Sequence, residues 1–206
     1  MKILIATQEK YVPFIMEVIQ PYDNSEHIIM MNFRKPTSDW NDYDVGISFM
    51  WDRKIQKFEL DIAPWINFHP GPLPEYKGRN LCYHAIMNGE TEFGATIHYM
   101  DENFDTGDII EVRKFDITPD MTAEDLSWYA NHYCAVMFQD YLPRILAGEV
   151  FQTTKNVGGH YYPYHKISDN LPLGNTEEKF IRAVTYKDFH PKINIGGVTY
   201  KIVKDE

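Results

Sequence analysis

The chain has 206 residues, of which 44% are hydrophobic, and its formal net charge at pH 7 is −10. This size and composition are sufficient for a folded domain with its own core, and the acidic balance argues against a nucleic-acid partner, which would need clustered lysines and arginines. No stretch reaches the roughly 20 apolar residues of a membrane span, so we expect no membrane partner and a cytoplasmic location.

The first third of the chain alternates short apolar runs with helical segments. Residues 2–6, KILIA, form an apolar run that is typical of a strand buried on both faces and is too short for a signal peptide. A helix is expected over residues 11–22, and three further strands over residues 27–33, 42–51 and 63–68. This alternation predicts an α/β fold with a Rossmann-like, mostly parallel sheet and helices on both faces.

Further along, residues 93–100 and 108–117 are expected to pair as antiparallel strands around an acidic loop. Thr122 and Asp125 then stand at the spacing of a capping box, at the start of a long amphipathic helix. Asn80 stands where it would cap a shorter helix upstream.

The composition changes after the long helix and becomes rich in Tyr, Gly and Lys. We therefore divide the chain into a catalytic core, residues 1–150, and a C-terminal extension, residues 151–206. The extension is expected to contain a helix and a small β-hairpin appendage that turns at Gly196 and Gly197. Because two strands alone are marginally stable in water, the hairpin is expected to pack on its own core or on a second chain.

The stretch INFHPGPLPEYKGRN, residues 66–80, follows directly from the fourth predicted strand. Asn67 and His69 lie two residues apart, so an extended backbone points both side chains to the same side and Phe68 toward the core. Ligands bind beyond the carboxyl ends of the strands in open α/β sheets. An amide donor and a titratable imidazole are therefore predicted to converge on one small group.

The acidic loop DENFDTG, residues 101–107, offers a third candidate side chain. As a pattern it is also typical of a solvated hairpin turn. Gly107 follows Asp105 by two residues, which favours a tight turn that directs this carboxylate inward. His98, on the preceding strand, is more often a structural histidine in such a position. A zinc site built with His69 is a weaker alternative, and we expect no metal.

Several motifs occur in order between residues 64 and 115: Asn-x-His-Pro, Leu-Pro-x-x-x-Gly, Gly-Glu-x-x-x-Gly-x-Thr-x-His-x-x-Asp and Asp-x-Gly-x-Ile. The chain resembles the formyltransferases that use 10-formyltetrahydrofolate. This resemblance implies 10-formyltetrahydrofolate as formyl donor, no metal, and a cis bond between Leu73 and Pro74. It places the family's catalytic residues on Asn67, His69 and Asp105. One departure is that the family commonly has Ser or Thr after His-Pro, where this chain has Gly71.

These residue types suit formyl transfer to an amine, which passes through a tetrahedral oxyanion. Asn67 can donate to that oxygen, His69 can help to move the amine proton, and Asp105 can hold the imidazole or a relay water. We expect the folate to lie against exposed strand ends, whose N–H and C=O groups suit its ring. The expected contacts to the folate are Phe49, Trp51, Met100, Asp101 and Asp105. Phe49 and Trp51 are equally typical of core residues.

Three classes of amine acceptor are open within this family. Methionyl-tRNA formyltransferases carry a further C-terminal barrel for tRNA. A tRNA substrate fits poorly with the acidic net charge of this chain. Glycinamide ribonucleotide formyltransferases have a glycine-rich phosphate loop after the first strand, where this chain reads ATQEKYVPF. The segments YHKISD and INIGGVTYKI resemble the nucleotide-sugar N-formyltransferases of surface polysaccharide synthesis, which serves lipopolysaccharide and O-antigen. This resemblance implies a nucleotide-linked amino sugar, a dTDP-4-amino-4,6-dideoxy sugar, as substrate, and a homodimer.

Candidate contacts to such a substrate lie in the loop after His69 and in the extension. Positively charged side chains suit a diphosphate, and the candidates are Lys77, Arg79, His165 and Lys166. Asn80, beside them in the loop, is a further candidate. The tyrosines Tyr161, Tyr162 and Tyr164 suit stacking on a base. They are equally typical of residues that pack the extension on the core. Two other functions stay open, a formyltetrahydrofolate hydrolase and a folate-binding module without turnover.

Overall fold

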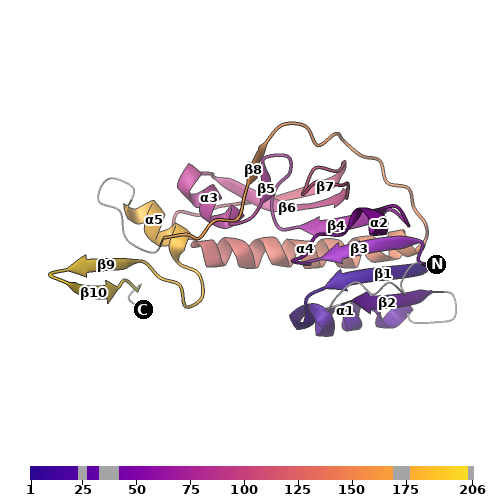
Figure 1. Ribbon diagram of the computed structural model, residues 1–206, viewed down its shortest axis with the longest axis horizontal. Helices are drawn as coiled ribbons and strands as arrows, with labels where there is room; N and C mark the ends of the chain where they lie inside the picture. The colour runs from indigo at the N-terminus through magenta and orange to yellow at the C-terminus, as the bar shows by residue number, and fades with distance from the viewer. Residues whose placement is uncertain (23–26, 33–41, 169–176, 204–206) are drawn as a thin grey trace.

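The computed structural model describes residues 1–22, 27–32, 42–168 and 177–203. Its main sheet has six strands in the order β2-β1-β3-β4-β6-β7 (Figure 1). The first four pair in parallel, while β6 runs antiparallel to β4 and to β7, which confirms the predicted mostly parallel α/β sheet. The strands are β1 (Lys2–Thr7), β2 (Ile28–Asn32), β3 (Val45–Phe49), β4 (Trp65–His69), β6 (Glu92–Tyr99) and β7 (Ile109–Asp116).

Helices and turns cover both faces of this sheet. On β1, Ile3 and Ile5 belong to one apolar cluster and Leu4 and Ala6 to another, as the alternation of side chains along a strand requires. The first cluster packs against α1 (Val12–Ile19) and the long helix α4 (Ala123–Leu146), and the second against α2 (Lys57–Leu60). Short 3₁₀ turns, η1 (Glu9–Tyr11) and η2 (Gln20–Tyr22), flank α1.

Of the two helix N-terminal caps predicted from the sequence, one is present in the structure and one is not. Thr122 Oγ1 accepts from the Asp125 backbone N–H, and Asp125 Oδ2 accepts from the Thr122 N–H, which confirms the capping box of α4. Helix α3 (Leu81–Asn88) begins directly after Asn80, but the Asn80 side chain does not cap it. Instead Asn80 Nδ2 donates to the backbone oxygen of His165 at 2.9 Å, so the prediction of a side-chain cap is wrong.

The first part of the C-terminal extension packs on the core. Strand β8 (His160–Tyr162) pairs in parallel with β5 (Tyr76–Gly78), and α5 (Glu177–Val184) packs against α3. The predicted hairpin is confirmed as β9 (Lys192–Ile195) and β10 (Val198–Lys201), and it projects away from the sheet (Figure 1). The division at residue 150 stays a prediction.

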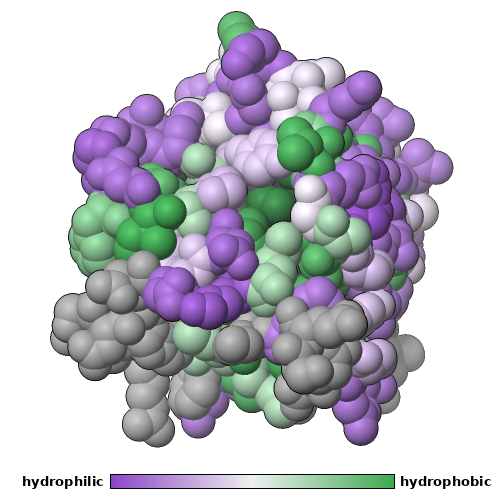
Figure 2. All heavy atoms as spheres, turned by 90° about the vertical axis from the view of Figure 1, so that its right-hand side faces the viewer, coloured by the Kyte–Doolittle hydropathy of each residue, from purple (hydrophilic) through white to green (hydrophobic). Residues whose placement is uncertain are grey.

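The two ends of the parallel strands carry different kinds of residue. Strands β1 and β3 start at the right-hand end of Figure 1 and point to the left. Figure 2 faces that right-hand end and shows hydrophilic side chains interspersed with separate hydrophobic ones. Within the described ranges, no helix combines the length and apolar character that a membrane crossing demands. The carboxyl ends of the parallel strands, at the opposite end, carry the residues considered next.

Candidate active site

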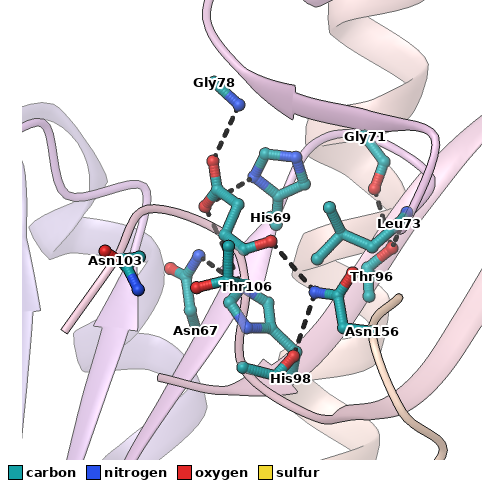
Figure 3. Close-up of polar contacts among 12 residues, drawn as sticks. Asn67, His69, Gly71, Leu73, Gly78, Thr96, His98, Asn103, Thr106 and Asn156 are labelled. Atoms are coloured by element: carbon teal, nitrogen blue, oxygen red, sulfur yellow. Dashed lines mark hydrogen bonds and ion pairs between the residues drawn. The ribbon is translucent and has the colours of Figure 1, made fainter. Parts of the chain in front are cut away.

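The structure brings the three predicted catalytic side chains together (Figure 3). Asn67 and His69 come from the carboxyl end of β4, with Phe68 between them in the aromatic core. Asp105, from the loop between β6 and β7, places Oδ1 3.4 Å from His69 Nδ1. Its Oδ2 accepts the backbone N–H of Gly78 at 2.9 Å. The carboxylate therefore connects the imidazole with the loop that follows it.

The two ring nitrogens of the buried His69 have different surroundings. Nε2 lies 2.8 Å from the backbone oxygen of Tyr76, which can only accept, so Nε2 carries a proton. Nδ1 is then the nitrogen that faces Asp105 and is available to gain or lose a proton. This arrangement can move a proton between an incoming amine, the imidazole and the carboxylate.

His98 is a fourth member of the site. Its Nδ1 donates to the backbone oxygen of Tyr99 at 2.6 Å, so its Nε2 accepts from Asn67 Nδ2 at 3.0 Å. Burial, followed by the nearness of His69, lowers the pKa of His98 to about 4, although Asp105 acts in the opposite direction. A neutral His98 thus orients Asn67 and leaves the second Nδ2 hydrogen of that amide for a ligand. His98 is buried with both ring nitrogens hydrogen-bonded, as expected of a structural histidine, and its register opposite Asn67 in the neighbouring strand also gives it contact with the site.

The turn that presents Asp105 differs from the one predicted. Asp105 itself has a left-handed backbone with φ of 57°, whereas Gly107 lies outside that region. Gly107 is needed for close approach, because a Cβ there would lie 1.9 Å from the backbone oxygen of Tyr99. Asp101 shapes the same loop, since its Oδ1 accepts the backbone N–H of Asn103 at 2.9 Å.

The loop after His69 is held by Thr96. Its Oγ1 accepts the Leu73 N–H at 2.9 Å and donates to the backbone oxygen of Gly71 at 2.7 Å. The bond between Leu73 and Pro74 is cis, which confirms the expectation from the family resemblance. A Cβ at position 71 would lie 2.7 Å from Leu81 Cδ1 and 2.9 Å from His69 Nε2. This close packing explains why glycine stands where the family commonly has Ser or Thr.

Gly71→Ser is expected to reduce turnover about 10-fold and to destabilise the fold by about 1–3 kcal/mol, because the added atoms overpack the site around His69. Steady-state kinetics and urea denaturation measure the two effects. A matched test adds Leu81→Ala, which makes room for the new side chain and should recover part of the loss in a double-mutant cycle. Wild-type turnover and stability in Gly71→Ser would contradict this account of the glycine.

Asn67, His69, His98 and Asp105 lie in the wall of a cavity of about 840 Å³, a volume within the range of ligand pockets in proteins. Ten of the predicted contacts line it: Trp51, Arg79, Asn80, Met100, Asp101, Asp105, Tyr161, Tyr164, His165 and Lys166. Sequence reasoning missed Gln8, Arg53 and Lys54, which also line the cavity. The signal that could have found them was their place in the segments that follow the carboxyl ends of β1 and β3.

Three predicted contacts lie elsewhere. Phe49 is 1% exposed and packs among core aromatic rings, so its assignment to the folate is corrected. Lys77 is buried and donates from Nζ to the backbone oxygen of Gly158 at 2.8 Å, which corrects its assignment to a diphosphate. Tyr162 stacks on Tyr76 and on His84, so it packs the extension on the core.

One hydrogen-bond donor in the cavity wall, Trp51 Nε1, is unsatisfied among the described residues. Trp51 lines the cavity, and this nitrogen is buried. A buried donor of this kind is costly unless a ligand or water accepts from it. Across the described ranges, no group of three or more His, Cys, Asp or Glu side chains is arranged to hold a metal ion.

Comparison with known proteins agrees with this geometry. Residues 52–133 match the family model described as Formyl transferase. Methionyl-tRNA formyltransferase from Sorangium cellulosum (strain So ce56) is 34% identical over 142 residues, which are 68% of this chain and 43% of that protein. This chain therefore spans less than half the length of that curated relative.

Solved structures extend the likeness to the whole chain. A 4-N formyltransferase from Francisella tularensis has a TM-score of 0.84 at 20% identity, covering 99% of this chain and 97% of that one. An N-formyltransferase from Helicobacter canadensis, solved with folinic acid and dTDP-3-aminofucose, has a TM-score of 0.76 at 21% identity, covering 95% and 84%. At these identities the likeness shows the fold. The chain therefore carries a formyl transferase domain, and Asn67, His69 and Asp105 all lie within the matched residues.

Proposed function

We propose that this protein transfers a formyl group from 10-formyltetrahydrofolate to the amine of a nucleotide-linked amino sugar in the cytoplasm. The observation that carries the proposal is the convergence of Asn67, His69 and Asp105 on one wall of a large cavity. The same cavity is lined by cations and aromatic rings from the C-terminal extension, which suit a nucleotide.

The side chains have complementary tasks in this reaction. 10-Formyltetrahydrofolate, when bound, supplies an activated formyl group. Asn67 keeps one Nδ2 hydrogen free to donate to the developing oxyanion, a contact typically worth about 3–4 kcal/mol in a dry site. His69 Nδ1, which faces the Asp105 carboxylate, can take up the proton that the attacking amine loses, and this proton is returned to the leaving nitrogen of tetrahydrofolate when its bond to the formyl carbon breaks.

The folate is assigned to the part of the cavity between the end of β3 and the loop after β6. Trp51 and Met100 line this part, and the unpartnered Trp51 Nε1 suits an acceptor on a heterocycle. The Helicobacter canadensis neighbour was solved with folinic acid, which supports a folate in this fold.

The nucleotide is assigned to the part of the cavity walled by the extension. Arg79, His165 and Lys166 line it and suit a diphosphate, while Tyr161 and Tyr164 suit a base. We propose a dTDP-4-amino-4,6-dideoxy sugar as the acceptor and surface polysaccharide synthesis, including lipopolysaccharide O-antigen, as its use. A neighbour solved with dTDP-3-aminofucose supports the nucleotide-sugar class.

The deciding experiment is the amine dependence of tetrahydrofolate formation. The protein is incubated with 10-formyltetrahydrofolate alone, and with a dTDP-4-amino-4,6-dideoxy sugar, glycinamide ribonucleotide or methionyl-tRNA. Product formed only with the amino sugar supports the proposal. Release without any amine indicates a hydrolase, and folate binding without release in any arm indicates a binding module.

The hairpin leads us to propose a homodimer. Val198 pairs directly with Ile195, and their side chains are 53% and 60% exposed, so one copy leaves an apolar strip uncovered. A two-fold pairing of hairpins covers this strip, and such dimers are the commonest closed assemblies.

Light scattering of the full chain at micromolar concentration is expected to give twice the monomer mass. Truncation after His190 removes the hairpin and keeps α5, so it should give the monomer mass. A matched full-length variant, Ile195→Lys with Val198→Lys, should do the same because charges replace the apolar strip. A monomeric full chain, or a truncated chain that still dimerises, would contradict the proposal.

A further inference from the structure

Residues 154–160, which we call the crossing segment, lie across the two loops of the site. Thr154 exchanges both backbone hydrogen bonds with Ile109, at 2.9 and 2.8 Å. At the other end, the Gly158 backbone oxygen accepts from the buried Lys77 Nζ at 2.8 Å. Gly159 passes so close to Pro74 that a Cβ there would lie 1.6 Å from the Pro74 oxygen. The crossing segment is therefore fixed on the core at both ends.

Asn156 is the residue of the crossing segment that reaches the catalytic loop (Figure 3). Its Nδ2 donates to the backbone oxygen of Asp105 at 2.9 Å and to that of Gly107 at 3.0 Å. Both acceptors are carbonyl oxygens, so only the amide nitrogen can face them and the orientation of the side chain is determined. One amide thus ties together the carbonyls on either side of Thr106.

This bond pattern matters because Asp105 has an unfavourable backbone conformation. A left-handed φ of 57° is strained for a residue with a Cβ, and such conformations persist where surrounding contacts enforce them. The same conformation places Oδ1 3.4 Å from His69 Nδ1 and Oδ2 2.9 Å from the Gly78 N–H. If the loop relaxed, the carboxylate would leave both partners.

We propose that Asn156 is a positioning residue for formyl transfer, which acts by holding the backbone of Asp105 in its left-handed conformation. The proposal rests on the proposed function for its kinetic readout, and on the geometry alone for its structural readout. It gives the C-terminal extension a role in the chemistry as well as in substrate binding. No short motif pointed to Asn156, because its partners lie about 50 positions earlier in the chain.

The kinetic test compares Asn156→Ala with the wild type. We expect kcat to fall roughly 10- to 100-fold with little change in either KM, because displacement of a catalytic group acts on the transition state. Asn156→Gln keeps two N–H donors on a longer side chain and should recover part of the loss. The matched control is Lys155→Ala, which removes an exposed ion pair with Asp108 on the same loop and should leave kcat unchanged.

The structural test needs no substrate. Amide hydrogen exchange by NMR follows the Gly78 N–H, whose acceptor is the Asp105 carboxylate. Asp105→Ala sets the rate without the acceptor, and Asn156→Ala should approach that rate while Lys155→Ala stays at the wild-type rate. Asn156→Gln should exchange at a rate between those of the wild type and Asn156→Ala. Wild-type exchange at Gly78 in a folded Asn156→Ala chain would overturn the proposal, as would wild-type kcat in that variant. If the wild type transfers no formyl group, the proposed function fails and the exchange rate still decides the role of Asn156.

Discussion

Replacement of Asn67, His69 or Asp105 by alanine is expected to lower kcat at least roughly 100-fold while the chain stays folded. Each side chain acts on charge or protons that develop in the transition state. Asn67 supplies a donor to the oxyanion, His69 exchanges a proton at Nδ1, and Asp105 faces that nitrogen at 3.4 Å. The three act as a unit, so double replacements should cost little more than the single ones.

The sharpest variant of this set is Asp105→Asn. It keeps the shape of the side chain and an oxygen for the Gly78 N–H, but it removes the negative charge that faces His69. A matched control is Asp108→Asn on the same loop, whose carboxylate pairs with the exposed Lys155. Single-turnover rates of formyl transfer measure the effect, and circular dichroism verifies folding. Near-normal turnover in any one variant would remove that residue from the mechanism.

The second large effect concerns pH and His98. Burial and the nearness of His69 lower its pKa to about 4 in the folded protein, against about 6.5 in an unfolded chain. Below pH 6.5 the unfolded chain therefore binds a proton that the folded protein does not. The contribution of His98 to stability is complete above pH 6.5 and falls, by up to about 1.4 kcal/mol per pH unit, as the pH decreases toward about 4.

Urea denaturation of the wild type and of His98→Gln between pH 7.5 and 4.5 measures this contribution. Gln still offers an acceptor to Asn67 and a donor to the Tyr99 carbonyl, but it does not titrate. The free energy of unfolding should decrease with falling pH more steeply in the wild type, by on the order of 3 kcal/mol over the whole range. Equal slopes in the two proteins would show that His98 is not held neutral.

The sequence alone determined the strands of the main sheet, the long helix α4 and the main pair of the site. Continuous or alternating apolar runs marked the strands, and the capping box marked the start of α4, because these signals act over a few neighbouring residues. The placement of Asn67 and His69 on one side of a strand follows from the two-residue period of extended chain, and the carboxyl edge of the sheet follows from its parallel order. Asp105 was a candidate from its acidic loop, and the family resemblance assigned it to the catalytic residues.

Only the tertiary structure decided how neighbouring side chains divide between core and cavity. Phe49 and Trp51 lie two positions apart, so a continued strand would point both to one side. The strand ends at Phe49, and a φ of 52° at Met50 redirects the chain, so Phe49 enters the core and Trp51 lines the cavity. Such a break depends on the packing of the whole sheet end.

The remaining assignments depended on contacts between distant segments. From its place in the loop, Lys77 was predicted to bind a phosphate. In the structure β8 pairs with β5, and the Lys77 ammonium donates to the nearby Gly158 carbonyl instead. His98 became part of the site because β6 lies beside β4 and places its Nε2 against Asn67. Asn156 meets the Asp105 loop because the crossing segment returns over the sheet. Local patterns specify which atoms a residue carries, but the partner that satisfies each buried donor or acceptor is supplied by the fold.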